Sequence, residues 1–283
     1  MTGIPAVSGS LPYLLSANFF RTRDTFRQDL IDESQLVNAI AFIPAAAPPT
    51  GHTVFDHIFG RAFAASGGTT GMIIDPATIY YSGQSLGAIQ GAMDVASNPR
   101  ISKAAFNVGG GTQVDVFTTS PAFAPAVNQL LAGLGITPGT AAYLQFLVVA
   151  KTILDPADPI NYVGHLTDAA TTLPNLLVMP PAPHQAAKKI LSQMAQCDQV
   201  VPNPFGFVYS ANAGVGPLPP TGAAGTFQLF RSSAAASASC PTGGAVSHGF
   251  LLDFSNAPIA VTGQGDIAAF VTADTHPPSV RQF

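Results

Sequence analysis

The chain has 283 residues, of which 47% are hydrophobic and only 9% are charged, and its formal net charge is −4. This is a globular composition, and its apolar content excludes an intrinsically disordered chain. Lysine and arginine do not cluster, so nothing indicates a nucleic-acid surface, and no stretch approaches the 18 continuous apolar residues that predict a transmembrane helix. A chain of this length suits a single α/β domain over residues 1–283.

The predicted elements begin after an irregular lead-in at residues 1–16. Apolar residues at helical spacing predict a helix over about residues 16–45, which a proline-rich break ends. A second helix is predicted over residues 54–65. The first residues lack the basic segment and apolar run of a secretory signal, so we expect either a cytoplasmic chain or one whose signal has been removed.

The most informative segment is Gly-Gln-Ser-Leu-Gly at residues 83–87, which follows the β-branched and aromatic run at residues 79–82. A helix of small residues is predicted directly after it, over residues 88–95. Strand, Gly-x-Ser-x-Gly and helix together are the pattern of a nucleophile elbow, which presents its serine at the carboxyl end of a strand. The pattern predicts Ser85 as a nucleophile and the Leu86 backbone amide as an oxyanion donor. The alternative is a plain turn.

Three further strands are predicted after the elbow helix, over residues 104–108, 190–194 and 225–230. Between the first two of these, residues 120–170 are rich in alanine, leucine and valine at helical spacing, with several prolines as interruptions. An insertion at this point of a hydrolase commonly folds as a helical cap over the active site. The predicted fold class is therefore α/β, with a mostly parallel sheet flanked by helices and a helical cap at residues 120–170.

A serine nucleophile requires a base within hydrogen-bond reach and a carboxylate that orients the base. Asp198 follows the strand predicted at residues 190–194 and precedes Val-Val-Pro, so it lies on the loop after a late strand and is the predicted acid. Asp155 and Asp158 compete with it. Their proline-punctuated surroundings predict turns and helix caps instead.

The base must be one of six histidines. The chain order nucleophile, acid, base excludes those that precede Ser85 or Asp198. These are His52, His57, His165 and His184. His276 lies in a proline-rich tail, whereas His248 follows a glycine-bearing loop and precedes an apolar run, so His248 is the predicted base. The alternative is a histidine on a surface loop.

Cys197 and Cys240 are the two cysteines of the sequence, and each lies near a predicted triad residue. Either both are free thiols or they form a disulfide between the acid loop and the histidine loop, and the disulfide is favoured. Closing a loop of about 40 residues is expected to stabilise the fold by roughly 3–4 kcal/mol, and it indicates an oxidising compartment. Neither cysteine has a neighbour at zinc-ligand spacing and no phosphate loop is present, so neither a metal nor a cofactor is expected.

The Ser85 elbow, the Cys-Asp-Gln-Val-Val-Pro-Asn segment at 197–203 and the Ser-His-Gly-Phe segment at 247–250 together resemble an α/β-hydrolase. More narrowly, residues 21–29, the elbow and residues 155–162 resemble the later part of bacterial extracellular lipases of the virulence-factor type. The resemblance covers most of the chain between residues 15 and 255. It implies hydrolysis of carboxylic esters, lipid-like or with small acyl groups, and it favours an extracellular or periplasmic location.

The chain departs from these lipases in one respect. They carry several strands and a His-Gly loop, the source of one oxyanion amide, ahead of the segment that corresponds to residues 21–29. No such strands are recognised before Ser85, so we expect the sheet to lack its usual N-terminal strands, and the second oxyanion donor is unassigned. The elbow strand would then have an uncovered edge, and we expect a second copy of the chain to cover it in a homo-oligomer.

These patterns predict a serine carboxylesterase or lipase that works through Ser85, His248, Asp198 and an acyl-enzyme intermediate. Other acyl hydrolases, such as thioesterases, amidases or polyesterases, use the same residues because all of them form a tetrahedral oxyanion. A catalytically inactive, hydrolase-like binding module is the alternative from a different class.

Overall fold

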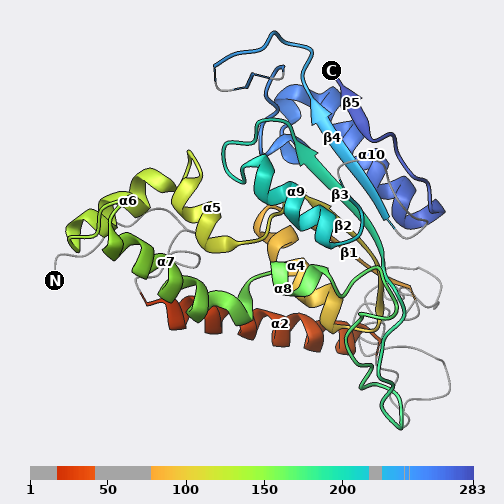
Figure 1. The fold of residues 1–283 in the computed structure, drawn as a ribbon. Helices are drawn as coiled ribbons and strands as arrows, with labels where there is room; N and C mark the ends of the chain where they lie inside the picture. Colours follow the sequence, from red (N-terminus) through yellow and green to blue (C-terminus); the bar gives the residue numbers. More distant parts are fainter. Residues whose placement is uncertain (1–17, 42–77, 217–224, 239, 242) are drawn as a thin grey trace, which may run out of the picture.

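The structure is a computed structural model that describes residues 18–41, 78–216, 225–238, 240–241 and 243–283 (Figure 1). In these residues five strands form one sheet in the order β1-β2-β3-β4-β5, and every neighbouring pair is parallel. The strands are β1 (Ile79–Gln84), β2 (Ile101–Asn107), β3 (Lys189–Ala195), β4 (Gly225–Arg231) and β5 (Val280–Gln282). Parallel neighbours cannot be joined by a tight turn, so longer connections with helices link them.

Helices flank both faces of the sheet. They are α2 (Phe19–Ala41), α4 (Leu86–Ser97), α5 (Gln113–Thr119), α6 (Ala124–Gly133), α7 (Ala141–Leu154), α8 (Ile160–Val163), α9 (Asn203–Asn212) and α10 (Ala257–Ala273), with 3-10 turns at η1 (Asp155–Ala157), η2 (Phe250–Leu252) and η3 (Phe254–Asn256). An all-parallel sheet covered on both sides is an α/β architecture, and with the strand–elbow–helix unit at β1 and α4 the fold is α/β-hydrolase-like. None of the described helices combines the length and apolar character needed to cross a bilayer.

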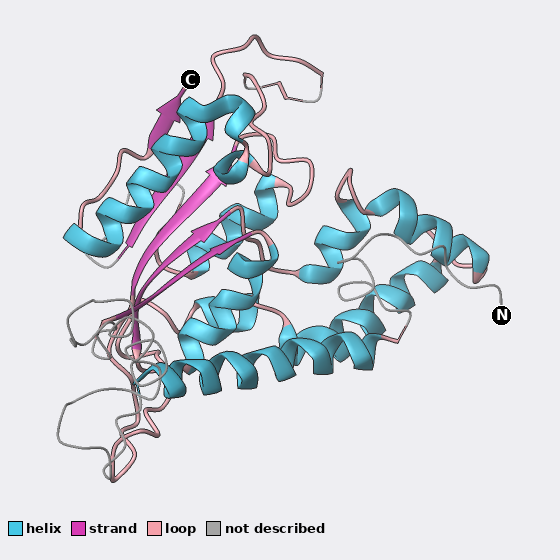
Figure 2. Ribbon diagram, turned by 180° about the vertical axis from the view of Figure 1, so that it is seen from behind, coloured by secondary structure: helices cyan, strands magenta, loops and turns pink. Residues whose placement is uncertain are grey.

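The two faces of the sheet contact different helices because successive side chains of a strand point to opposite sides. On one face, Phe106 of β2 packs edge to face on Tyr209 of α9, with ring centroids 5.9 Å apart, and the Tyr209 hydroxyl donates to the Ala88 carbonyl of α4 over 2.7 Å. On the other face, the buried side chains of Ala105 and Leu191 pack on α10. Figure 1 shows α9 in front of the strands. Figure 2, which is seen from behind, shows α10 in front of the opposite face of the sheet.

The long helix α2 packs on α4 through the buried ring of Phe26, which contacts Met93. The Gln90 amide of α4 donates to the Phe26 carbonyl over 2.9 Å. Helices α6 and α7 extend away from the sheet, and α7 lies alongside α2, where Phe146 packs on Phe19 with ring centroids 5.8 Å apart (Figure 1).

The connection from α8 to β3 forms a hairpin beyond the amino ends of the strands (Figure 1). Asn175 and Ala182 exchange two backbone hydrogen bonds of 2.9 and 3.0 Å across it. Its tip exposes successive apolar side chains, and Met179 is 88% exposed.

The strands expected over residues 104–108, 190–194 and 225–230 are present as β2, β3 and β4, and the expected helix over 16–45 is present as α2. Residues 120–170 contain helices α6, α7 and α8, as expected. Strand β5 lies in the segment that the sequence described only as a proline-rich tail, so that description was incomplete. The helix expected over 54–65 lies outside the described residues.

Strand β1 is an edge strand of the sheet in the described part of the chain, as expected for the elbow strand. The expectation that N-terminal strands are missing concerns a stretch that includes residues 42–77, which lie outside the described residues.

Candidate active site

The elbow places Ser85 at a positive φ between β1 and α4, with φ 55° and ψ −114°. A non-glycine residue adopts this region at a cost of order 1–3 kcal/mol. The turn is also too tight for a side chain at Gly83, because a Cβ atom there would lie 2.3 Å from the Gly87 carbonyl oxygen. The Ser85 amide donates to the Asn107 carbonyl of β2 over 2.8 Å, which fixes the turn to the sheet.

The structure brings the three predicted side chains together. His248 Nε2 lies 2.7 Å from Ser85 Oγ, and His248 Nδ1 lies 2.7 Å from Asp198 Oδ2. The side chain of Asp198 is 3% exposed and that of His248 is 15% exposed. With Nδ1 protonated and donating to the carboxylate, Nε2 is left to accept the serine proton.

The second carboxylate oxygen of Asp198 is held by its own loop. Oδ1 accepts the backbone N–H groups of Val200 and Val201 over 2.8 and 3.0 Å. These two bonds fix the plane of the carboxylate and leave Oδ2 for the imidazole. The carboxylate is therefore oriented by backbone donors rather than by other charged side chains.

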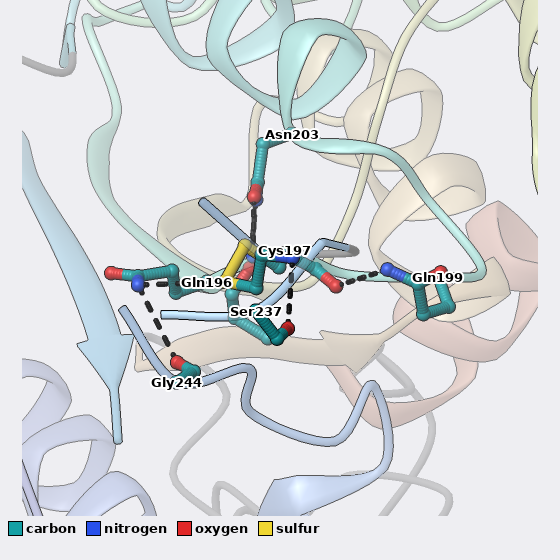
Figure 3. Close-up of a disulfide and its surroundings, with 8 residues drawn as sticks. Gln196, Cys197, Gln199, Asn203, Ser237 and Gly244 are labelled. Atoms are coloured by element: carbon teal, nitrogen blue, oxygen red, sulfur yellow. Dashed lines mark hydrogen bonds between the residues drawn. A yellow bond between two sulfur atoms is a disulfide. The ribbon is translucent and has the colours of Figure 1, made fainter. Parts of the chain in front are cut away.

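Cys197, which has φ 55°, and the residue before it hold the acid loop through several bonds. The Cys197 amide donates to Asn203 Oδ1 over 2.7 Å, and the Cys197 sulfur forms a disulfide with Cys240 (Figure 3). The preceding residue, Gln196, accepts the Val246 amide on its carbonyl over 2.9 Å. The loop that carries the acid is thus joined, by a covalent bond and by backbone pairing, to the segment that leads to His248. The favoured alternative for the two cysteines, a disulfide, is the one present.

The Leu86 amide is the first N–H of α4, so it has no acceptor within the helix. An amide at this point, together with the positive end of the helix dipole, can stabilise negative charge on the carbonyl oxygen of an acyl group attached to Ser85. The family resemblance locates a second donor ahead of residues 21–29, and residues 1–17 of that stretch lie outside the described residues.

A small pocket of about 30 Å³, open in part to solvent, begins at Ser85. Its walls are mostly apolar and come from α2, α4, α5, the start of α6 and the acid loop. The lining side chains include Phe26, Leu86, Ile89, Val116, Phe117, Phe123, Val200 and Val201. Gly110 lets the walls approach, because a Cβ atom there would lie 2.6 Å from Val201 Cγ1. Such a lining fits a hydrocarbon group better than a charged one.

The rival acids lie elsewhere and cap helices, as expected. Asp158 accepts the Thr112 and Ile160 amides on Oδ1 over 3.0 and 3.1 Å, and the Gln113 amide on Oδ2 over 2.8 Å. Burial raises the pKa of Asp158, while these three donors lower it. Asp155 lies in η1, where it accepts from a neighbouring asparagine.

The rejected histidines with described positions bond to other groups. His165 and His184 contact the carbonyls of Thr171 and Thr172, and His276 contacts the Thr226 hydroxyl. His52 and His57 lie outside the described residues. Within the described part of the chain, no three histidine, cysteine or carboxylate side chains are grouped to hold a metal ion.

Two residues at the site were not predicted. Asn107 receives the Ser85 amide, and Gln84 donates through Nε2 to the His248 carbonyl over a long 3.4 Å. Gln84 occupies one of the two variable positions of the Gly-x-Ser-x-Gly motif, so the motif carries no signal for it. The aromatic wall at Phe117 and Phe123 also went unrecognised, since only the folded chain brings it to the serine.

No family model matches the chain, and no curated protein matches it. Among solved structures, the chain is similar to a puromycin-hydrolyzing peptidase of Mycobacterium tuberculosis, with 16% sequence identity and a TM-score of 0.43. The similarity covers 80% of this chain and 26% of the peptidase, so the chain spans about a quarter of that protein's length. The fold assignment rests on the sheet and the elbow, and the chemistry rests on the side chains at Ser85.

Proposed function

We propose that the chain is a serine hydrolase that cleaves carboxylic esters through Ser85, His248 and Asp198. One observation carries the proposal: a single imidazole lies 2.7 Å from both the serine hydroxyl and the buried carboxylate. The positive φ of the serine and the free amide at the start of α4 support it, because a nucleophile elbow requires both.

In the first half of the reaction, Ser85 Oγ bonds to the ester carbonyl carbon while its proton passes to His248 Nε2. The carbonyl oxygen becomes an oxyanion beside the Leu86 amide, and Asp198 stabilises the imidazolium. The carbon–oxygen bond to the alcohol then breaks, and the leaving oxygen takes the proton from Nε2.

In the second half, a water molecule bonds to the acyl carbon and gives a proton to His248 Nε2. The bond from the acyl carbon to Ser85 Oγ breaks, and Oγ takes back the proton as the acid departs. The mostly apolar pocket at Ser85 supports an acyl group as its occupant. We further propose that the helices within residues 120–170 form its cap, because Phe123, the residue that precedes α6, lines this pocket.

The proposal is tested with chromogenic butyrate and octanoate esters, assayed with and without a serine-directed alkyl phosphonate. We expect turnover, loss of turnover after labelling, and the phosphonate mass on the peptide that contains Ser85. The Ser85→Ala variant should fold, by circular dichroism, and show neither turnover nor label. A folded wild-type chain that is inert and unlabelled would instead favour the hydrolase-like binding module.

The same assay separates the ester proposal from other acyl transfers. An oxygen ester, a thioester and an amide with one common acyl group should rank with the ester highest in kcat/KM. A higher value for the thioester or the amide would reassign the substrate class and leave the three side chains in the same roles.

We also propose a homo-oligomer in which a second copy covers the edge of β1. The position of β1 at the edge of the sheet in the described residues supports it, because uncovered edges favour pairing with another chain. Light scattering at micromolar concentration should give a mass above that of the monomer, and a stable monomer contradicts the proposal. The disulfide near the triad supports an oxidising, extracellular or periplasmic setting.

A further inference from the structure

Four side-chain amides lie in one row across the sheet beneath the elbow. Gln84 of β1 pairs in register with Asn107 of β2, Asn107 with Gln193 of β3, and Gln193 with Gln228 of β4. Residues in register on neighbouring strands share a face of the sheet, and here it is the face that α10 covers. Asn107, Gln193 and Gln228 are each fully buried, at 0% exposure.

Side-chain hydrogen bonds join three of the four amides, those of Asn107, Gln193 and Gln228. Asn107 Nδ2 donates to Gln193 Oε1 over 3.0 Å, and Gln193 Nε2 donates to Gln228 Oε1 over 3.0 Å. Gln193 Nε2 also donates to the Gly263 carbonyl of α10 over 3.1 Å. Gln193 and Gln228 each donate and accept, and Asn107 donates, so the bonds from Asn107 to Gln228 run in one direction.

At the end of the row away from β1, the last amide contacts an ion pair between α10 and β5. Gln228 Nε2 donates to Asp266 Oδ2 over 2.6 Å, and the guanidinium of Arg281 in β5 contacts both carboxylate oxygens of Asp266, over 2.6 and 3.0 Å. A two-pronged arginine–carboxylate contact has a fixed geometry. This pair therefore anchors the row at a point where the side chains are only partly buried.

The other end of the row reaches two members of the triad. The carbonyl of Asn107 accepts the Ser85 amide over 2.8 Å, and Gln84 Nε2 donates to the His248 carbonyl over 3.4 Å. Gln84 Oε1 and Asn107 Oδ1 are buried, and neither has a hydrogen-bond partner among the described residues. The amide oxygens of the row that lack a hydrogen-bond partner are thus the two nearest the elbow.

A role in folding alone gives a poor account of this row. Replacing both partners of a buried hydrogen bond by apolar groups of the same shape costs little stability, so packing does not require three buried amides in the middle of a sheet. Apolar side chains cannot form the directional hydrogen bonds that join these amides. The hydrogen bonds of the row add to the backbone pairing that holds β2 against β3 and β3 against β4, and the Asn107 carbonyl belongs to β2.

We propose that Asn107 and Gln193 are positioning residues, which hold the Ser85 elbow in reach of His248 through a hydrogen-bonded row anchored at Asp266 and Arg281. This inference rests on the proposed function, in which Ser85 is the nucleophile. Asn107 and Gln193 act through the Asn107 carbonyl, which accepts the Ser85 amide, and neither residue is placed to contact the substrate.

The first test compares Gln193→Met with Gln185→Met. Both changes replace a buried glutamine, and Gln185 donates to the Ala96 carbonyl over 3.1 Å, away from the triad. For Gln193→Met we expect kcat on the butyrate ester to fall about 10- to 100-fold, since small displacements of reacting groups have effects of this size, while KM changes less than twofold. Gln185→Met should lower the melting temperature and leave kcat unchanged.

The second test uses Gln193→Glu, which distinguishes positioning from packing. The glutamic acid accepts from Asn107 in either state, but it donates to Gln228 or Gly263 only when protonated. The ratio of variant to wild-type kcat, and of their phosphonate labelling rates, should therefore fall as pH rises. A ratio that does not change with pH overturns the proposal, as does a folded Gln193→Met with wild-type kcat.

If Gln193→Met does not fold, Arg281→Met tests the positioning proposal in its place. Arg281 is partly exposed at the far end of the row, so its loss should be tolerated while kcat falls about two- to tenfold, the size of a transmitted coupling. An unchanged kcat in this variant overturns the anchored row. A wild-type chain that neither turns over esters nor takes the phosphonate overturns the proposed function as well, whereas an active wild type with unaffected row variants overturns the positioning alone.

Discussion

Cys197 is joined to Cys240 by a disulfide that holds their Cα atoms 5.5 Å apart. Cys197 directly precedes Asp198, and Cys240 begins the segment that runs to His248. The acid and the base therefore come from two loops that are covalently joined. The two cysteines are 43 positions apart in the sequence, and the segment between them includes all of β4 and α9, so the bond constrains this loop in the unfolded chain.

Removing the disulfide should cost both stability and activity. For the Cys197→Ala/Cys240→Ala variant we expect the free energy of unfolding to fall by about 2–4 kcal/mol, and kcat to fall because the acid loop is less well held. Urea titration and ester assays, both at a temperature where the variant is folded, measure the two effects. An unchanged unfolding midpoint would show that the bond contributes nothing to the fold.

Asp198→Asn should lower kcat by on the order of 10⁴-fold, and Ser85→Ala by on the order of 10⁶-fold. The asparagine amide can donate to Nδ1, which favours the wrong imidazole tautomer, but it leaves the nucleophile in place. Initial rates on the butyrate ester provide the measurement, with Asp155→Asn as a control that keeps wild-type activity. Equal losses in Asp198→Asn and Asp155→Asn would remove Asp198 from the mechanism.

Gly83→Ala should destroy the elbow, because the new methyl group would lie 2.3 Å from a backbone oxygen that cannot move independently. Gly133→Ala is the matched control. A Cβ atom at Gly133, the last residue of α6, meets nothing within 4 Å, so alanine there should leave activity intact and raise stability by up to about 1 kcal/mol. Thermal melts and phosphonate labelling distinguish the two, and full labelling of Gly83→Ala contradicts the elbow geometry.

Phe117→Ala should shift the acyl preference toward longer chains. The Phe117 ring lies edge to face on Phe123, with centroids 5.6 Å apart, and both line the pocket at Ser85. Its removal lengthens or widens the space for an acyl group, so the ratio of kcat/KM for octanoate to that for butyrate should rise several-fold. Phe20→Ala, at an exposed position on α2, should leave the ratio unchanged. A ratio unaffected in Phe117→Ala would place the acyl group elsewhere.

Asp94 of α4 should make the fold less stable at high pH. Burial, and then the negative charges of Glu33 and Asp29, raise its pKa from an ordinary 3.8 to about 7. Between these values the folded chain keeps a proton that the unfolded chain has released, so stability falls as pH rises from about 4 to about 7.

The corresponding variant is Asp94→Asn, which removes this titration. It should match the wild type in melting temperature near pH 4 and exceed it near pH 8. Asp32→Asn, at an exposed position on α2, is the control, and its difference in melting temperature from the wild type should not change between pH 4 and pH 8. A difference between Asp94→Asn and the wild type that is constant across this pH range would contradict the assignment.

The sequence predicted those parts of the fold that depend on local pattern. The elbow could be identified because the two glycines and the strand and helix around the serine all lie within about 20 residues of one another. Asp198 and His248 followed from chain order and from their loops, and the disulfide followed from the closeness of each cysteine to one of them.

The remaining features depend on long-range pairing that no local pattern records. Strand β5 has three residues and forms only by pairing with β4. The amide row arises because Asn107 and Gln193, which are 86 residues apart, meet in register. In the sequence each is one of several polar residues in its strand, so nothing marks it as part of a site.

The hairpin closed by Asn175 and Ala182 projects from the end of the sheet opposite the elbow (Figure 1). An attachment point at its tip, such as an inserted tag or a single cysteine, would fasten the molecule to a support with the reactive serine directed away from it. Immobilisation through the tip of this hairpin should therefore leave the reactive serine accessible to an ester in solution.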